Sequence, residues 1–201
     1  MSTLDKHLRL AVLAEQIKTC TRCELHANRT HATVSRGSHN ATVMFVGEAP
    51  SEVDDETGIP FMGHAGQLLD RMIVAMGLAP EEVFLAHVCR CVTPAHRSPT
   101  PEETAACVPH LHEQIQVVAP RVIVTLGTTA ARAILGDSRG LKTLRGEWRI
   151  YRHGRAVIPV MPTYHPAYLL RETQAGRVDA KASAWKDLQS VMARLGREVR
   201  P

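Results

Sequence analysis

Four short apolar segments, separated by segments with helical spacing, constrain the fold of this chain most strongly. The apolar segments predict buried strands at residues 42–47, 83–89, 121–127 and 156–160. The spacing of apolar residues predicts helices at residues 3–19, 65–76, 101–118 and 179–195. Strands that alternate with helices predict an α/β fold: a three-layer α/β/α sandwich with a central, mostly parallel four-stranded sheet. Alternation over residues 147–161 adds a hairpin or an edge strand.

Two loops leave the carboxyl ends of predicted strands, at residues 48–64 and 162–171. Open α/β sheets bind their ligands at this edge. The first loop is rich in glycine and carries Phe61, one of only three phenylalanines in the chain. A plain turn between a strand and a helix would have a similar glycine content, so this loop alone leaves a turn and a ligand site open. Residues 24–41 are polar and predict a further loop.

Length and charge narrow the class of protein. The 201 residues fit one domain, 1–201, that can bury a full core. No stretch approaches the roughly 18 apolar residues of a membrane span, and the early charges argue against a secretory signal. We therefore expect a cytoplasmic protein without a membrane partner. The net charge of +4, mostly from arginine, is compatible with binding nucleic acid.

The five cysteines indicate ligands rather than disulfides in a reducing compartment. Cys20 and Cys23 form a C-x-x-C at the end of the first helix, and Cys91 and Cys107 lie downstream. Cys89 and Cys91 alternate along an extended segment, so we expect their side chains to point to opposite faces and not to bind the same ion. Four thiolates suit zinc or an iron–sulfur cluster. A redox C-x-x-C with three buried thiols is the alternative.

Several motifs in a fixed order identify a family resemblance. They are Gly47-Glu48-Ala49-Pro50, Gly58-x-Pro60-Phe61-x-Gly63-x-Ala65-Gly66, Arg97-x-Pro99-Thr100-Pro101-Glu102-Glu103, and the run from Thr163 to Arg171. Together with the cysteines they resemble the iron–sulfur uracil-DNA glycosylases of family 4 over nearly the whole chain. The resemblance implies a 4Fe-4S cluster bound by Cys20, Cys23, Cys91 and Cys107, with Cys89 as the spare thiol.

The same resemblance implies a monomeric DNA repair enzyme. It would excise uracil from DNA by hydrolysing the N-glycosidic bond, start base excision repair, and leave abasic-site DNA as its product. Neither motif loop contains a lysine that could form a Schiff base with the sugar, so we expect a monofunctional glycosylase. Slow release of the abasic product is a further expectation.

Family position also implies roles for residues of the base pocket, into which the nucleotide is extruded. Phe61 would stack on uracil, and His165 would donate to its O2 as negative charge develops on the base. Gly47, Glu48 and Ala49 would border the base. Ala49 stands where related glycosylases have an Asp that positions water, so the catalytic carboxylate would be Glu48 or Asp54.

Two histidines depart from the family pattern. His87 stands where family members have the Asn that reads uracil, and one imidazole nitrogen cannot both accept from N3–H and donate to O4. His87 would therefore donate to O4 or be structural. His96 resembles the reactive His of the UDGX type, which becomes joined to DNA, but the Arg-rich insertion of that type is missing. His96 would otherwise contact a phosphate or solvent.

Two rival functions remain open at this stage. The first is a protein that binds uracil or abasic-site DNA in a stable or covalent complex with little turnover. The second is a nucleoside or nucleotide hydrolase. For contacts with DNA, the predicted phosphate ligands are Arg90, Arg97, Arg145 and Arg171. The predicted wedges for the gap left by a flipped base are Pro94, Tyr168, Leu169 and Leu170.

Overall fold

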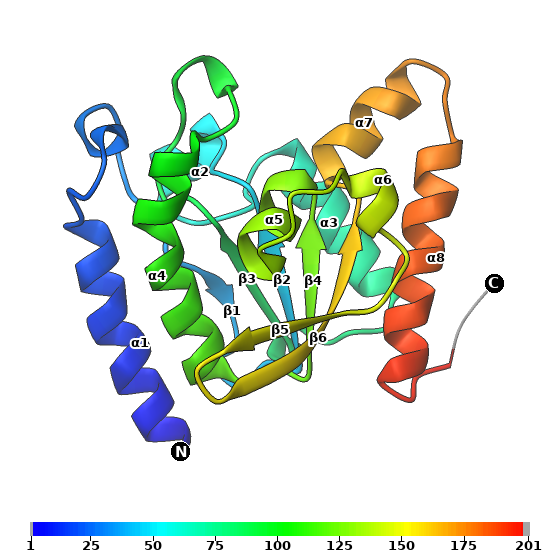
Figure 1. Cartoon of the computed structure of the whole chain (residues 1–201), viewed down its shortest axis with the longest axis horizontal. Coiled ribbons are helices and arrows are strands. Elements are labelled where there is room, and N and C mark those ends of the chain that lie inside the picture. The colour runs from blue at the N-terminus through cyan, green and yellow to red at the C-terminus, as the bar shows by residue number, and fades with distance from the viewer. Residues whose placement is uncertain (1, 199–201) are drawn as a thin grey trace.

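A six-stranded sheet lies between two layers of helices in the computed structural model, which describes residues 2–198 (Figure 1). The strand order is β1-β3-β2-β4-β6-β5. The strands are β1 Arg36–Gly37, β2 Val43–Gly47, β3 Val83–His87, β4 Val122–Leu126, β5 Arg149–His153 and β6 Ala156–Thr163. The central strands β3, β2, β4 and β6 run parallel, as predicted. Antiparallel β1 and β5 extend both edges, so the sheet has six strands rather than four.

Eight α-helices and three short 3₁₀ turns connect the strands within residues 2–198. The α-helices are α1 Thr3–Lys18, α2 Glu52–Thr57, α3 His64–Ala75, α4 Pro101–Val118, α5 Thr128–Leu135, α6 Leu141–Leu144, α7 Pro166–Gln174 and α8 Asp179–Arg194. The 3₁₀ turns are Glu24–Ala27, Pro80–Glu82 and Pro94–His96. No helix in this described range is long and apolar enough to cross a membrane.

The alternation of side chains along the strands divides the core into two halves. On β2, Met44 and Val46 pack in the cluster that contains residues of α1, α4 and α5. Val43 and Phe45 point to the opposite face and pack with residues of α3 and α8. Because successive strand residues face opposite sides, one apolar run fills both cores. This confirms the α/β/α sandwich.

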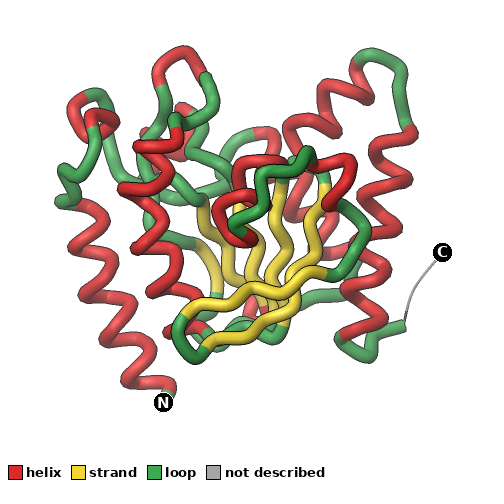
Figure 2. The backbone as a smooth tube through the Cα atoms, in the orientation of Figure 1, coloured by secondary structure: helices red, strands yellow, loops and turns green. Residues whose placement is uncertain are grey.

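Short helices occupy the strand-end segments that the sequence predicts as loops. α2 lies inside residues 48–64, where the Ser51 side chain accepts from the Asp54 N–H at 3.3 Å and closes a capping box. β6 continues to Thr163, and α7 begins at Pro166, so much of the second predicted loop is helical. Figure 2 shows these helices in red around the upper ends of the strands. A helix of one or two turns is too short to show a clear apolar period, which explains the error.

Candidate active site

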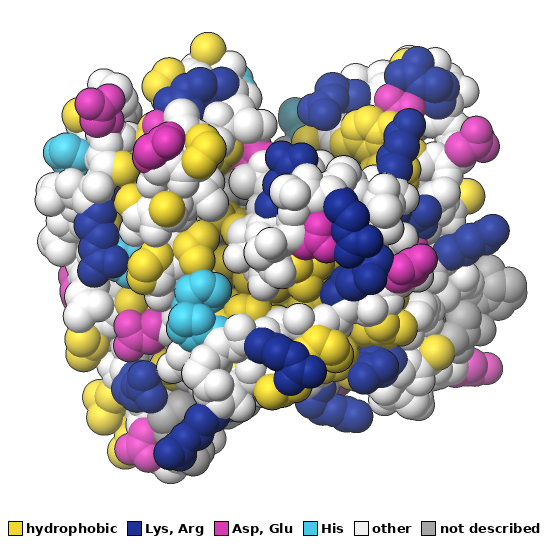
Figure 3. Space-filling model, in the orientation of Figure 1, with side chains coloured by type: hydrophobic (Ala, Val, Ile, Leu, Met, Phe, Trp, Pro, Cys, Tyr) yellow, Lys and Arg dark blue, Asp and Glu magenta, His cyan; other side chains and the backbone are white. Residues whose placement is uncertain are grey.

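A broad cleft lies at the carboxyl ends of the parallel strands. It has a volume of about 1470 Å³, above the roughly 300–1,000 Å³ of typical small-molecule pockets. Its walls come from the loop after β2, the loop after β3, α4, α5 and the start of α7. Figure 3 shows hydrophobic side chains in the hollow between α4 and α5. The cleft has room for a polymer that places one unit deep inside it.

Phe61 lies at the base of this cleft between two histidines. Its ring centroid is 4.3 Å from that of His87 and 6.4 Å from that of His165. A Cβ atom on Gly47 would lie 2.6 Å from the Phe61 ring and 2.7 Å from the His87 ring, so only glycine permits this packing. A Cβ atom on Gly66 would lie 1.8 Å from the Phe61 carbonyl oxygen. The motif glycines thus bring three predicted pocket residues together.

Asp54 shapes the loop after β2, which we call the β2 loop (residues 48–63). One carboxylate oxygen accepts from the Ser51 N–H at 3.0 Å, and the other accepts from the Met62 N–H at 2.6 Å. The side chain is buried, and Met62 follows Phe61, whose φ of 62° is left-handed. Both oxygens of Asp54 therefore hold the backbone around Phe61. Asp54 also lines the cleft, and its role as a catalytic carboxylate stays a prediction.

Glu48 lines the cleft, as Ala49 and Asp54 do. The Thr129 hydroxyl donates to Glu48 Oε2 at 2.5 Å, and Thr129 lies in the first turn of α5. Negative charge is stabilised at the amino end of a helix. Glu48 is thus held in place while its other oxygen, Oε1, has no hydrogen-bond partner among the described residues.

His165 is arranged as a neutral hydrogen-bond donor. The Ala167 N–H donates to His165 Nδ1 at 3.1 Å, which also caps α7. Burial and the charge of Arg171 lower the pKa of His165 to about 4. At neutral pH the single ring proton therefore lies on Nε2. The structure supplies a neutral N–H group beside Phe61.

His87 is also neutral, for a similar reason. Burial lowers its pKa well below the usual range, and the proximity of His165 and Arg90 adds to this effect. Its Nδ1 is buried with no hydrogen-bond partner among the described residues. A buried N–H without an acceptor is costly, so the tautomer with the proton on Nε2 is favoured.

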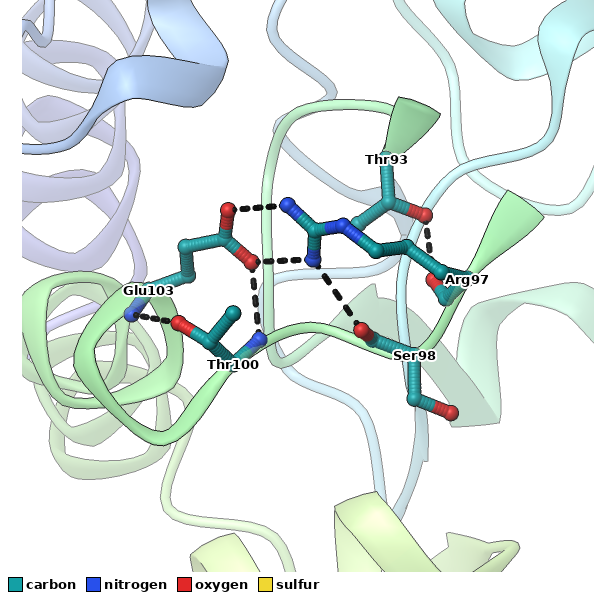
Figure 4. A network of polar contacts seen from close by, with 5 residues as sticks. All are labelled: Thr93, Arg97, Ser98, Thr100 and Glu103. Carbon is teal, nitrogen blue, oxygen red and sulfur yellow. Dashed lines mark hydrogen bonds and ion pairs between the residues drawn. The ribbon is translucent and has the colours of Figure 1, made fainter. Parts of the chain in front are cut away.

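The loop after β3, which we call the β3 loop (residues 88–100), is closed by an ion pair. Arg97 donates two hydrogen bonds to the Glu103 carboxylate, at 2.8 and 2.6 Å, and one to the Ser98 carbonyl at 3.1 Å (Figure 4). The carboxylate also accepts from the Thr100 N–H at 2.8 Å, and the Thr93 hydroxyl donates to the Arg97 carbonyl at 2.6 Å. Arg97 thus ties the loop to the start of α4.

The β3 loop and the β2 loop meet at His96. Ala95 and His96 both have left-handed backbones, with φ of 50° and 54°, a conformation that costs energy for residues other than glycine. His96 Nε2 lies 3.2 Å from Glu52 Oε1, and 61% of the His96 side chain is exposed. Glu52 begins α2, so this contact joins the two loops beside the cleft.

The predicted DNA-contacting residues divide into surface and interior positions. His96, Arg97, Tyr168 and Arg171 line the cleft, and Pro94 is exposed beside them. Leu169 is 2% exposed and packs in the interior, so its predicted role as a wedge is wrong.

The predicted phosphate contact of Arg90 is also wrong. Arg90 is 2% exposed and donates to the Val34 carbonyl at 2.8 Å and to Gln114 Oε1 at 2.6 Å. Arg90 lies beside the buried thiols of Cys91 and Cys107, and this position, rather than attraction to phosphate, decides its role. Arg145 is bound to Asp187 at 2.6 Å.

A second, smaller cavity lies where α1 ends. It is lined by four cysteines, Cys20, Cys23, Cys91 and Cys107, together with Arg29, Arg90, His110 and others. Cys89 is buried outside this lining. Arg29 Nη1 donates to Cys91 Sγ at 3.2 Å, and the Arg90 backbone N–H donates to Cys107 Sγ at 3.3 Å. The fold therefore brings the four predicted ligands to one place.

The thiols of this cavity differ in acidity. A hydrogen bond from Cys89, aided by the charge and backbone N–H of Arg90, lowers the pKa of Cys107 to about 6. Burial raises the pKa of Cys23 and Cys91. Within residues 2–198 no three His, Cys, Asp or Glu side chains are grouped to hold a single metal ion.

Three residues of these sites escaped the sequence analysis: Thr129, Arg29 and His110. Thr129 follows Gly127 at the end of a strand, which is a signal that could have been used. His110 lies one helical turn after Cys107 and lines the cysteine cavity, where its buried Nε2 has no partner among the described residues. No sequence pattern distinguishes Arg29.

The fold and the cleft define an α/β protein that can hold a planar ring against an aromatic side chain and two neutral imidazoles. The sequence profile described as the Uracil DNA glycosylase superfamily matches residues 34–189, and the chain belongs to this family. It is 42% identical over 163 residues to the type-4 uracil-DNA glycosylase of Thermotoga maritima, covering 81% of this chain and 83% of that protein.

Other relatives agree with this placement. The type-4 enzyme of Sulfurisphaera tokodaii is 39% identical, with 85% of this chain and 77% of that protein covered. The type-5 uracil-DNA glycosylase of Pyrobaculum aerophilum is 31% identical, with 74% and 70% covered. The resemblance inferred from the motifs is confirmed.

Proposed function

We propose that this protein excises uracil from DNA by hydrolysing the N-glycosidic bond, and so starts base excision repair. One observation carries the proposal: Phe61 lies between neutral His87 and His165 in a cleft larger than a small-molecule pocket. The type-4 names of relatives that match most of the chain support the same reaction.

The base pocket supplies the chemistry through preorganised groups. A nucleotide extruded from the duplex places its base in the cleft, where Phe61 offers an aromatic surface. As the glycosidic bond breaks, negative charge develops on the base, and the Nε2–H of His165 donates to it. Because His165 is already neutral and oriented by its Nδ1 bond, little reorganisation accompanies the reaction.

Glu48 is the carboxylate we assign to the sugar side of the reaction. Thr129 holds one of its oxygens, which leaves the other to orient water or to stabilise the cationic sugar. Gly47 and Ala49 flank it and border the base. His87 would donate its Nε2–H to a carbonyl oxygen of the base. The amino group of cytosine could not accept this hydrogen bond.

We also propose that Cys20, Cys23, Cys91 and Cys107 hold a 4Fe-4S cluster. Such clusters are bound by four cysteine thiolates, and the small cavity brings four thiols together. The unpartnered Nε2 of His110 in the same cavity offers a donor that a cluster sulfur would accept. When bound, the cluster supplies a link between the end of α1, the β3 loop and α4. The residues of the base pocket then carry out the reaction.

Residues around the cleft would contact the DNA backbone and the gap left by the flipped base. Arg171 supplies charge, Pro94 and His96 are exposed on the β3 loop, and Tyr168 is half-buried on α7. We propose that residues 1–201 act as a single-domain monomer, which light scattering in solution tests.

A labelled oligonucleotide with one uracil, incubated with excess protein and then with hot alkali, tests the reaction. We expect alkali-dependent cleavage at uracil, and none in a matched oligonucleotide with thymine. The Phe61→Leu variant keeps an apolar side chain but loses the stacking surface, which is worth about 1–3 kcal/mol per base. Excision should therefore fall about 10- to 100-fold. Intact DNA after alkali would overturn the proposal.

The monofunctional character has its own test. Neither motif loop contains a lysine, although Lys142 lines the outer part of the cleft. Borohydride added during the reaction should therefore trap no protein on the DNA. A trapped product that Lys142→Ala removes would show a Schiff base and a bifunctional enzyme.

A protein that holds uracil or abasic-site DNA with little turnover is the alternative, because the exposed His96 lies on the same cleft. Reactions with substrate in excess distinguish the two. We expect repeated turnover, slowed by product release, and no detergent-resistant protein–DNA band. A single turnover with a band that His96→Ala removes would favour the alternative.

A further inference from the structure

A buried carboxylate lies behind the end of β6, outside the cleft. Asp187, on α8, is 2% exposed. Arg145 binds it in a fork, with Nη2 2.6 Å from Oδ1 and Nε 3.1 Å from Oδ2. The Thr163 hydroxyl donates to Oδ2 at 2.6 Å. Three hydrogen bonds thus converge on one buried side chain.

Arg145 connects this carboxylate to an aromatic residue of the cleft. Its guanidinium lies over the ring of Tyr164, 5.2 Å from the centroid, and also donates to the Ser183 carbonyl at 2.7 Å. Tyr164 in turn packs against Tyr168, with centroids 5.0 Å apart. The charge of Arg145 is therefore used inside the protein, which corrects its predicted contact with a DNA phosphate.

The two residues that this network holds directly precede His165. Thr163 is bound through its side chain to Asp187 and through its carbonyl to the Gly127 N–H at 2.9 Å. Tyr164 is covered by Arg145. The end of strand β6 is therefore held by Gly127, which follows β4, on one side and by Asp187 of α8 on the other.

Stability alone gives a weak reason for such an arrangement. Buried ion pairs add little net stability over apolar residues of similar volume, but a fork of hydrogen bonds fixes geometry tightly. Gly146 permits the close approach, because a Cβ atom there would lie 3.1 Å from Asp187 Oδ1 at a φ of +75°. The arrangement fits a role in positioning.

We propose that Asp187 is a positioning residue, which acts through Arg145 and Thr163 to set the place of Tyr164 and His165 in the cleft. The expected effect of Asp187 on the excision rate rests on the proposed function. Its expected effect on the position of His165 rests on the structure alone. Asp187 and Arg145 do not line the cleft, so they touch neither base nor sugar. A displacement of about 1 Å in a reacting group can cost about 100-fold in rate.

Rate measurements give the first test. Asp187→Asn keeps the shape but leaves Arg145 unmatched, and the single-turnover rate should fall about 10- to 100-fold with DNA affinity unchanged. Thr163→Val is nearly isosteric, removes only the hydrogen bond from the hydroxyl to the Asp187 carboxylate, and should lower the rate about 2- to 10-fold. Asp70→Asn removes the Arg36–Asp70 pair, whose two residues do not line the cleft, and serves as the control. A normal rate in both network variants would overturn the proposal.

A second readout does not depend on activity. The imidazole signals of His165 in ¹⁵N NMR report its environment in the folded protein. We expect these signals to shift in Asp187→Asn and to shift less in Thr163→Val. Unchanged His165 signals in both variants would overturn the positioning role. Failure of the wild-type protein to release uracil would instead overturn the proposed function and leave this readout valid.

Discussion

The β2 loop and the β3 loop reach the same cleft, but they are held in different ways. The β2 loop is fixed by its own chain: Asp54 binds two backbone N–H groups, and Gly66 lets Phe61 pack closely. The β3 loop contains two left-handed residues and is anchored at its ends, through Cys91 and through the pair of Arg97 with Glu103. The loop that carries Phe61 is therefore held by its own segment of the chain, whereas the β3 loop, which we propose faces DNA, is also tied to the cysteine cavity.

Loss of a cluster ligand should have the largest effect, because it should release the β3 loop and leave the β2 loop in place. Cys91→Ser should abolish the visible absorbance expected of a 4Fe-4S protein, because the cluster needs its thiolate. The β3 loop should then be cleaved by trypsin after Arg97, while the β2 loop stays protected. Cys89→Ala, which changes a thiol outside the cavity, should keep the absorbance. A colourless wild-type protein with bound zinc would contradict the cluster.

The neutral donor should account for the next largest effect. His165→Asn preserves a side chain that can cap α7 but removes the ring N–H that we propose donates to the base. Removing one preorganised donor costs about 10²–10³-fold in kcat. Single-turnover excision should fall by that factor, with thermal stability and cluster absorbance retained. The matched control is His7→Asn, at an exposed position of α1. Equal rates in the two variants would exclude His165 from the reaction.

A smaller effect should follow from weakening the β2 loop itself. In Asp54→Asn one of two backbone donors loses its acceptor, which costs about 1–3 kcal/mol. For a chain of this length that lowers Tm by about 2–12 °C. Calorimetry measures the change, and Asp137→Asn, at a half-buried position whose partner is the exposed Arg139, should shift Tm much less. An unchanged Tm in Asp54→Asn would mean that the loop does not depend on this carboxylate.

The smallest effect should appear in the dependence on pH. His165 has a pKa of about 4 in the folded protein and about 6.5 when unfolded. Between pH 6.5 and pH 4 this histidine is protonated mainly in the unfolded state. Its contribution to the free energy of unfolding is therefore constant above about pH 6.5 and falls as the pH drops toward about 4. Denaturant titrations at pH 7.5 and 5 should show a smaller loss in His165→Asn than in the wild type. A kcat that fell with a pKa near 6.5 would contradict a neutral His165.

The contrast between the loops also shows what sequence patterns can predict. The four parallel strands carry long apolar runs, so their positions were predicted correctly. β1 has only two residues and shows no pattern, whereas the alternation over residues 147–161 correctly predicts the edge hairpin of β5 and β6. The sequence predicts DNA contacts for Leu169 and Arg90, but packing against other elements buries both side chains.

The sequence by itself determined the α/β class, the family motifs, and the residue types at the cleft and in the cysteine set. These features depend on local periodicity and on short spacings between residues, both of which are visible in the sequence. The tertiary structure alone decided that Asp54 supports the backbone, that Thr129 holds Glu48, and that Asp187 reaches Arg145 and Thr163. Each of these contacts joins groups whose partner is set by how helices pack on the sheet or how a loop closes. Hydrogen bonds and burial depend on that arrangement in space, which no local pattern records.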